Sequence, residues 1–194
     1  MSNLIYSWRF ELDKIHPYAW HSNLFTKEEC EKIIEIGEKY LFEDGKVGGG
    51  VKNQKIREST IAWINPNEYT NWFYSKIVAS ILDLNKQFFG FDLTGLYEGL
   101  QFTKYISPNG KYDKHTDRAY NTGIRKLSIT VQLSDPKKEK GGDLLIYDGG
   151  KATKIKKQQG TLYAFPSFQV HEVSKITKGT RYSLVAWVGG PNFK

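Results

Sequence analysis

The chain has 194 residues, 39% of them hydrophobic and 14% aromatic, and a formal net charge of +7 at pH 7. This composition excludes a disordered protein and predicts one globular domain, residues 1–194, around a single core. The N-terminus lacks the apolar segment of a signal peptide, no apolar run is long enough to span a membrane, and Cys30 is the one cysteine. We therefore expect no membrane span, no disulfide, and a cytoplasmic, reducing environment.

Much of the positive charge lies in two lysine-rich runs, residues 137–140 and 151–157. An acidic partner or a nucleic acid would explain such runs. A solvated turn and an edge strand whose lysines discourage aggregation explain them more simply, and we favour this interpretation.

Residues 1–90 are predicted to supply helices and the first strands. Trp8–Leu12 alternates as a strand does, and a turn should follow at His21–Leu24. The segment Thr26-Lys27-Glu28-Glu29 is a capping box, in which the threonine and the last glutamate each satisfy the other's free backbone N–H. It predicts a helix that begins after Thr26 and ends near Tyr40–Phe42.

A glycine-rich segment, Gly45–Asn53, follows this helix. A phosphate-binding loop would need a helix directly after the glycines, whereas Ser59–Ile64 is predicted to be a strand. We therefore expect a mobile surface loop, and whether this loop is a lid near a site stays open. Asn65-Pro66-Asn67 then interrupts the chain and is predicted to cap a second helix, which extends to about Phe88.

From Phe91 onward the spacing of apolar residues changes from about 3.6 to about two, which is the period of β-strands. Turn sequences rich in glycine, proline and asparagine separate the expected strands. The clearest are Leu93–Ile106, Lys126–Ser134, Asp143–Tyr147, Ala152–Lys156, Thr161–Phe165 and Tyr182–Val188. Helices followed by about eight short strands predict an α+β fold, in which residues 91–194 form a jelly-roll core and the helices pack on one of its sheets.

The candidate chemistry lies in this β-rich half. His115 and Asp117 are two residues apart in the segment Tyr105–Asp117, so in an extended chain they face the same side. His171, which follows a predicted strand, would complete a set of two histidines and one carboxylate that suits non-haem Fe(II). Each residue alone is as readily a surface or core residue, but their order along strand-like segments favours a metal site.

Arg181 and Ser183 share one face of the last predicted strand. A guanidinium and a hydroxyl placed in this way can hold a carboxylate, the arginine through two N–H groups. A dicarboxylic co-substrate could therefore be bound with its far end at Arg181.

Together these residues resemble the signature of the Fe(II)- and 2-oxoglutarate-dependent dioxygenases. Framing residues narrow the resemblance to the prolyl 4-hydroxylase-like branch, and in particular to the PKHD-type hydroxylases of bacteria and phages. These residues are Gln101, Tyr105, Gly110, Tyr112, Leu127–Ser128, Leu133–Pro136, Gly141–Leu144 and Arg181–Ser183. The resemblance runs from about Leu93 to Gly190 and extends weakly to Arg57–Trp63.

The resemblance implies a double-stranded β-helix with the metal at its open end, held by His115, Asp117 and His171. It further implies that Arg181 pairs with the far carboxylate of 2-oxoglutarate. The other implied contacts of this co-substrate are Tyr105, Ser183 and Gln132. Gln132 departs from the pattern, because some prolyl hydroxylases have a tyrosine at its position, although an amide can also donate to a carboxylate.

The implied reaction consumes 2-oxoglutarate and O2, releases succinate and CO2, and hydroxylates a C–H bond, with ascorbate as a further candidate cofactor. A prolyl residue in a peptide or protein is the substrate that the resemblance favours. Tyr112 is expected to line the mouth of the pocket. Arg125 and Trp187 are candidate substrate contacts, with a solvated position as the alternative for Arg125 and a core position for Trp187.

Other functions stay open. The same chemistry could act on a free amino acid, another small molecule or a nucleic acid, or the jelly roll could be a binding protein without catalysis. Nucleic acid is disfavoured, because the nucleic-acid demethylases of this superfamily usually have a second arginine where this chain has Trp187. Neither the substrate nor the oligomeric state follows from any pattern in the chain.

Overall fold

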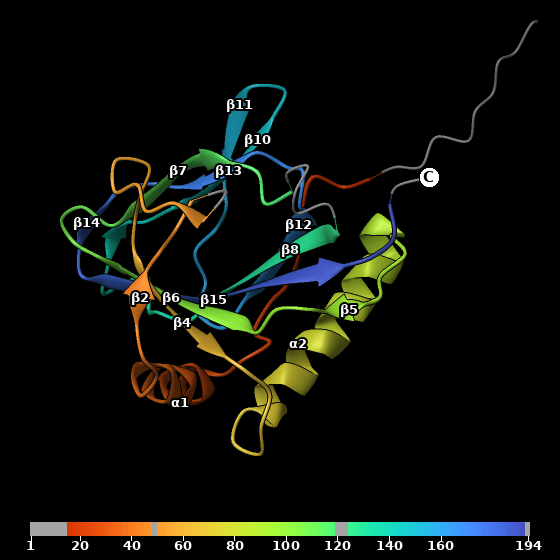
Figure 1. Cartoon of the computed structure of the whole chain (residues 1–194), viewed down its shortest axis with the longest axis horizontal. Coiled ribbons are helices and arrows are strands. Elements are labelled where there is room, and N and C mark those ends of the chain that lie inside the picture. The colour runs from red at the N-terminus through yellow and green to blue at the C-terminus, as the bar shows by residue number, and fades with distance from the viewer. Residues whose placement is uncertain (1–14, 48–49, 119–123, 193–194) are drawn as a thin grey trace, which may run out of the picture.

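The computed structural model describes residues 15–47, 50–118 and 124–192. The strand predicted at Trp8–Leu12 lies outside these residues. Two antiparallel sheets face each other, and two helices cover the outer face of the larger sheet (Figure 1). The predicted α+β architecture, with helices on one sheet only, is therefore confirmed. Among the described residues, no helix is both long and apolar enough to cross a membrane.

Helix α1 (Lys27–Glu38) begins at the predicted capping box. The Thr26 backbone N–H donates to the Glu29 carboxylate at 2.9 Å, and the Glu29 N–H donates to the Thr26 hydroxyl at 3.2 Å. The helix ends slightly before the predicted Tyr40–Phe42, because the backbone N–H of Tyr40 already bonds the Gly37 carbonyl in a tighter turn.

Helix α2 (Asn71–Leu84) continues into a π-helical turn, Asn85–Phe89, so its predicted end near Phe88 is confirmed. The predicted cap was wrong, because Thr70 and not Asn65-Pro66-Asn67 is the N-cap residue. The Asn67 side chain instead accepts from the Tyr69 N–H and builds the preceding turn.

Eight antiparallel strands form the larger sheet. In order across the sheet they are β1 (Ala19–His21), β12 (Leu162–Pro166), β8 (Arg125–Gln132), β15 (Thr180–Gly189), β6 (Leu100–Ile106), β4 (Thr60–Ile64) and β2 (Glu43–Asp44), with β5 (Gly95–Leu96) also paired to β15. Along β15, Leu184 and Ala186 pack into the core beneath the helices, whereas Arg181 and Ser183 face the other sheet. The strand thus divides its side chains by the period of two.

The smaller sheet contains five strands. In order they are β11 (Lys151–Lys154), β10 (Leu144–Asp148), β13 (His171–Val173), β7 (Lys111–His115) and β3 (Arg57–Glu58). A separate pair joins β9 (Lys140–Gly141) and β14 (Ile176–Lys178). The register of the five-stranded sheet places His171 directly opposite His115, which brings two residues far apart in the sequence to one point.

The lysine-rich runs differ from each other in the structure. Strand β11 is the outermost strand of its sheet and all of its residues are exposed, which confirms the edge-strand interpretation. In residues 137–140, by contrast, Glu139 is buried between exposed lysines, so this run is not simply a solvated turn. The described residues also contain more strands than the predicted eight, because β2, β3, β5, β9, β13 and β14 are too short to show a period.

Candidate metal centre and its cavity

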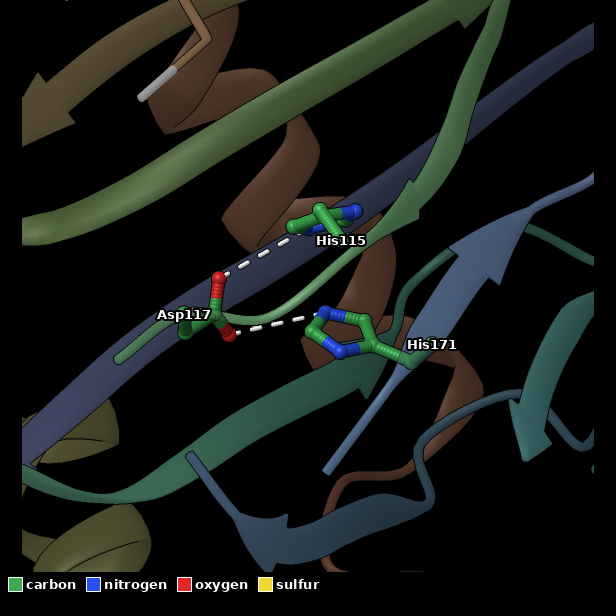
Figure 2. A group of neighbouring side chains, drawn as sticks. All are labelled: His115, Asp117 and His171. Atoms are coloured by element: carbon green, nitrogen blue, oxygen red, sulfur yellow. Dashed lines mark ion pairs between the residues drawn. The ribbon is translucent and has the colours of Figure 1, made fainter. Parts of the chain in front are cut away.

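The side chains of His115, Asp117 and His171, all able to bind a metal, point toward one another (Figure 2). His115 ends β7, Asp117 follows in the adjoining turn, and His171 begins β13. His115 Nε2 lies 3.6 Å from Asp117 Oδ1, and His171 Nε2 lies 3.5 Å from Asp117 Oδ2. The ligand atoms all lie within 4.8 Å of one another, which is close enough to hold a single ion.

Hydrogen bonds on the far side of each imidazole determine which nitrogen faces the carboxylate. His115 Nδ1 lies 2.8 Å from the Asp113 carbonyl oxygen, and His171 Nδ1 lies 3.0 Å from that of Gln169. Because a carbonyl only accepts, Nδ1 carries the proton in both rings and the Nε2 lone pairs point toward Asp117. Two lone pairs and a carboxylate directed at one point are a donor set that fits Fe(II).

The protonation states also suit a metal. Burial, together with the neighbouring His171, lowers the pKa of His115 to about 4, so its imidazole is neutral near pH 7. Burial disfavours the charged form of Asp117, but His171, His115 and the Ser128 hydroxyl outweigh this and lower the pKa of that carboxyl. The site therefore presents a neutral nitrogen donor at His115 and an ionised oxygen donor at Asp117.

Asp117 is fixed by two serines to which the sequence analysis gave no role. The Ser128 hydroxyl donates to Asp117 Oδ2 at 2.6 Å and lies 3.0 Å from the Ser167 hydroxyl. Since Ser128 has one proton to give, Ser167 must donate to Ser128. The Ser167 carbonyl also accepts the Asp117 backbone N–H at 3.0 Å. A polar residue at alternate positions of the otherwise apolar strand β8 was the available signal.

A cavity of about 420 Å³ extends from this group between the sheets. Nine of the ten predicted site residues line it. They are Tyr105, Tyr112, His115, Asp117, Arg125, His171, Arg181, Ser183 and Trp187. The tenth, Gln132, lies behind Arg181 and outside the cavity wall.

Arg181 is a buried cation that faces this cavity, with 3% of its surface exposed. Its Nε donates to Gln132 Oε1 at 3.1 Å, and its Nη1 donates to the Ser183 hydroxyl at 3.2 Å. The Tyr105 ring lies 5.5 Å from the guanidinium carbon. Burial lowers the pKa of Arg181, but a guanidinium stays charged in proteins. Because these hydrogen-bond partners are uncharged, an anion entering the cavity would gain a strong contact.

Gln132 has a different position from the one that we expected. Its Nε2 donates to the Ser134 carbonyl and to Glu139 Oε1, both at 3.2 Å, while its Oε1 accepts from Arg181. The amide therefore orients the guanidinium from behind. Its donors are already used, so the expected direct contact of this amide with a co-substrate carboxylate is not available.

Aromatic and charged side chains border the outer part of the cavity. Arg125 binds both oxygens of Glu98, at 2.8 and 2.5 Å, so it is not simply solvated. Its guanidinium carbon lies 3.9 Å from the centre of the Trp187 ring, and the ring centroids of Trp187 and Trp63 lie 6.1 Å apart. Trp187 is thus buried, as its predicted core position requires, and it also forms part of the cavity wall.

Arg57 connects the metal-binding group to the glycine-rich segment. Tyr112 stacks on His115 with ring centroids 3.5 Å apart, and the Arg57 guanidinium lies 4.6 Å from the Tyr112 ring. Arg57 also donates to the Lys46 carbonyl at 2.9 Å and to Gln101 at 2.8 Å. Lys46 borders the cavity, which agrees with a loop near the site. In the sequence analysis, Arg57 belonged only to a segment with a weak resemblance to the family.

The comparisons with known proteins identify the class. Residues 100–189, which contain all three candidate ligands and Arg181, match the family model of the 2OG-Fe(II) oxygenase superfamily. The protein is therefore an Fe(II)- and 2-oxoglutarate-dependent oxygenase. It is 32% identical over 167 residues to a PKHD-type hydroxylase of Picosynechococcus, with 85% of this chain and 74% of the relative covered. A PKHD-type hydroxylase of Prochlorococcus marinus is 29% identical over 169 residues, with 85% and 75% covered. The chain belongs to the PKHD-type hydroxylase family.

Solved structures confirm the predicted double-stranded β-helix. A prolyl hydroxylase from Trichoplax adhaerens, in complex with a hypoxia inducible factor peptide fragment, superposes with a TM-score of 0.76 at 20% identity over 90% of this chain and 84% of that chain. A Pseudomonas putida prolyl-4-hydroxylase gives a TM-score of 0.68 at 20% identity over 91% and 94% of the two chains.

Proposed function

We propose that this enzyme hydroxylates a prolyl residue of a peptide or protein, with iron held by His115, Asp117 and His171 and with 2-oxoglutarate anchored by Arg181. One observation carries the proposal. A single cavity brings together three convergent metal donors, a buried guanidinium and an aromatic mouth. These are the three binding functions that the reaction needs.

The metal donors come from the two strands β7 and β13 and the turn after β7, so their spacing depends on the sheet and not on a flexible loop. When bound, Fe(II) and 2-oxoglutarate supply the oxidation of a C–H bond, coupled to release of succinate and CO2. The protein supplies the geometry: Ser128 holds the Asp117 carboxylate, and backbone carbonyls hold both imidazoles in the required tautomer.

Arg181 would hold the far carboxylate of the co-substrate. The Ser183 hydroxyl already bonds this guanidinium, and the Tyr105 phenol lines the same cavity. A charge-assisted, bidentate contact in a buried site is both strong and directional. It would set the distance between the carboxylate end of the co-substrate and the metal, and so orient its reactive end.

The mouth suits a proline. The Trp187 and Trp63 rings offer apolar faces to a pyrrolidine ring. Arg125, held rigidly by Glu98, places N–H donors beside these rings, where they can bind a peptide carbonyl. The relatives are PKHD-type hydroxylases, and two solved neighbours are prolyl hydroxylases, one of them in complex with a peptide.

The test is succinate release from labelled 2-oxoglutarate with Fe(II) and ascorbate, screened against pools of proline-containing peptides, free amino acids and nucleic acids. The proposal predicts that a peptide pool stimulates release and that mass spectrometry finds one added oxygen on proline. Stimulation by amino acids or nucleic acids alone would show that the substrate is wrong. His171→Ala provides the blank.

A further inference from the structure

A buried acid lies within the lysine-rich residues 137–140. The side chain of Glu139 is 0% exposed, although Lys138 and Lys140 on either side of it are exposed. Its Oε1 accepts from Gln132 Nε2 at 3.2 Å and from Lys157 Nζ at 3.3 Å. Its Oε2 has no hydrogen-bond partner among the described residues. Burying a carboxylate is costly, and a fully satisfied polar turn would avoid that cost, so the acid needs an explanation.

Glu139 controls the orientation of the Gln132 amide. A carboxylate can only accept, so Gln132 must turn its NH2 group toward Glu139. Its carbonyl oxygen then faces Arg181, where it accepts the Nε–H at 3.1 Å. The opposite orientation of the amide would place its NH2 group against the guanidinium N–H and its oxygen against the carboxylate. Both contacts would be repulsive. Glu139 and the Ser134 carbonyl, which also accepts from this NH2 group at 3.2 Å, therefore fix the amide together, and the amide fixes the arginine.

The charges around this group also alternate. Lys157 pairs with Asp143 at 3.3 Å as well as with Glu139, and Asp143 pairs with Lys154 at 2.8 Å. Burial lowers the pKa of Arg181, and the negative charges of Glu139 and Asp143 oppose this change. Glu139 and Asp143 are therefore two negative charges near the cation that faces the cavity.

The same segment supports the stem of the arginine. Gly142 has a φ of +64°, and a Cβ atom at this position would lie 3.1 Å from Arg181 Cδ. The backbone can lie so close to the arginine because glycine has no side chain. Residues 139–142 thus contact the stem of Arg181 directly and its head through Gln132.

We propose that Glu139 is a positioning residue for the co-substrate: through Gln132 it sets the orientation in which Arg181 receives the far carboxylate of 2-oxoglutarate. The inference rests on the proposed role of Arg181. A glutamine can rotate its amide, and the acceptor-only neighbours Glu139 and the Ser134 carbonyl hold it in one orientation.

The test measures ligand binding without turnover, by water-proton relaxation of the Mn(II)-loaded protein. Glu139→Gln keeps the shape of the side chain and removes its charge. We expect it to weaken 2-oxoglutarate binding about tenfold, which corresponds to about 1.4 kcal/mol. The reason is that an amide at position 139 can donate as well as accept, so it holds the Gln132 amide less firmly in one orientation. A 2-oxo acid without a second carboxylate, such as 2-oxobutyrate, should bind the variant and the wild type equally, because it does not reach Arg181.

Glu38→Gln is the matched control. It also breaks an ion pair with a lysine, Lys104 at 2.8 Å, but on the helix side of the sheet. It should leave both ligands unaffected. Unchanged 2-oxoglutarate affinity in Glu139→Gln, or equal loss for both ligands, would overturn the proposal and leave Glu139 as a structural ion pair.

Two further variants keep the test decisive. Gln132→Leu removes the bridge and should give the same selective loss even if Glu139→Gln does not fold, and adding Glu139→Gln to it should weaken binding no further. Additive losses, or no loss in Gln132→Leu, would overturn the proposal. Arg181→Met distinguishes the role of Arg181 from that of Glu139. If Arg181→Met retains full 2-oxoglutarate affinity, the proposed anchor itself is wrong. If Arg181→Met loses affinity while Glu139→Gln and Gln132→Leu keep it, only the role of Glu139 is refuted.

Discussion

The two faces of the larger sheet have opposite chemistry. On the side of α1 and α2, strand β15 presents Leu184 and Ala186 to an apolar core. On the side of the cavity, the same strand presents Arg181, Ser183 and Trp187. Adjacent residues of one strand therefore belong to two different environments, because side chains alternate along a strand.

This difference separates stability from function. The helix side buries apolar surface, which is the main favourable contribution to folding. The cavity side buries a guanidinium, a carboxylate and several hydroxyls, and such groups contribute little net stability while they fix geometry. Substitutions on one face should therefore change the free energy of unfolding, and those on the other should change ligand binding.

The largest difference is expected for a pair of histidines. His171→Ala removes one of three convergent donors and should weaken Fe(II) binding more than about 100-fold, since loss of even an outer contact of a ligand typically costs 10- to 100-fold. His21, which lies 3.1 Å from Ser80 on the helix side, provides the control. Equal Fe(II) affinity of His171→Ala and His21→Ala in a metal titration would show that metal binding does not depend on the cavity side of the sheet.

Next in size is a pair of neighbouring residues on β15. Leu184, 1% exposed, packs in the helix-side core, and Leu184→Ala should lower the free energy of unfolding by about 2–5 kcal/mol. Val185 lines the cavity and is only partly buried, so Val185→Ala should cost about 1 kcal/mol or less. Urea denaturation of both variants measures the difference, and equal costs would contradict the separation of the two faces.

The cavity face should also make stability depend on pH. Folding lowers the pKa of His115 from 6.5 to about 4, so between these values the unfolded chain binds a proton that the folded chain does not. The free energy of unfolding of the metal-free protein should therefore rise by about 3 kcal/mol in total as the pH increases across this window, and acidification should reverse this rise. His115→Asn should flatten the rise, and an identical slope in this variant would assign it to other groups.

Removal of the buried cation should affect the binding of the co-substrate most strongly. Arg181→Met should raise the KM for 2-oxoglutarate on the order of 100-fold, because a charge-assisted bidentate contact is lost. It also leaves the Gln132 carbonyl oxygen without its Arg181 donor and Glu139 with one nearby cation fewer, so the melting temperature should fall as well. An unchanged KM would contradict the assignment of Arg181 to the co-substrate.

The smallest effect concerns a pair of serines. Ser128→Ala removes the hydrogen bond to Asp117 and should weaken metal binding about tenfold. Ser80→Ala on α2 also removes a buried hydroxyl that bonds a histidine, His21, but should leave metal affinity unaltered. The ratio of the two metal affinities gives the contribution of the Asp117 contact, and a ratio near one would remove Ser128 from the site.

The sequence predicted the parts of this protein that depend on local periodicity. The capping box at Thr26, the long strands and the two-residue spacing of His115 and Asp117 all lie within single segments. His171 and Arg181 were found because each lies at the end or on one face of a recognisable strand. The pairing of His171 opposite His115 itself appeared only in the sheet register.

What the sequence did not reveal depends on contacts between distant segments. Arg57 bonds Gln101, 44 residues away, and Ser128 bonds Ser167, 39 residues away. The burial of Glu139 could not be predicted, because a run of charged residues has the same sequence pattern whether or not one of its side chains is buried. The misplaced cap of α2 has a local cause, since Asn67 is equally suited to a turn and to a cap.

Crystals grown without oxygen in the presence of Fe(II) and 2-oxoglutarate would test the central claim most directly, through the iron anomalous signal. We expect one iron bound by His115 Nε2, Asp117 and His171 Nε2 at about 2.0–2.2 Å, with the far carboxylate of 2-oxoglutarate bound to the Arg181 guanidinium. Iron at another position, or a co-substrate whose far carboxylate lies away from Arg181, would contradict it.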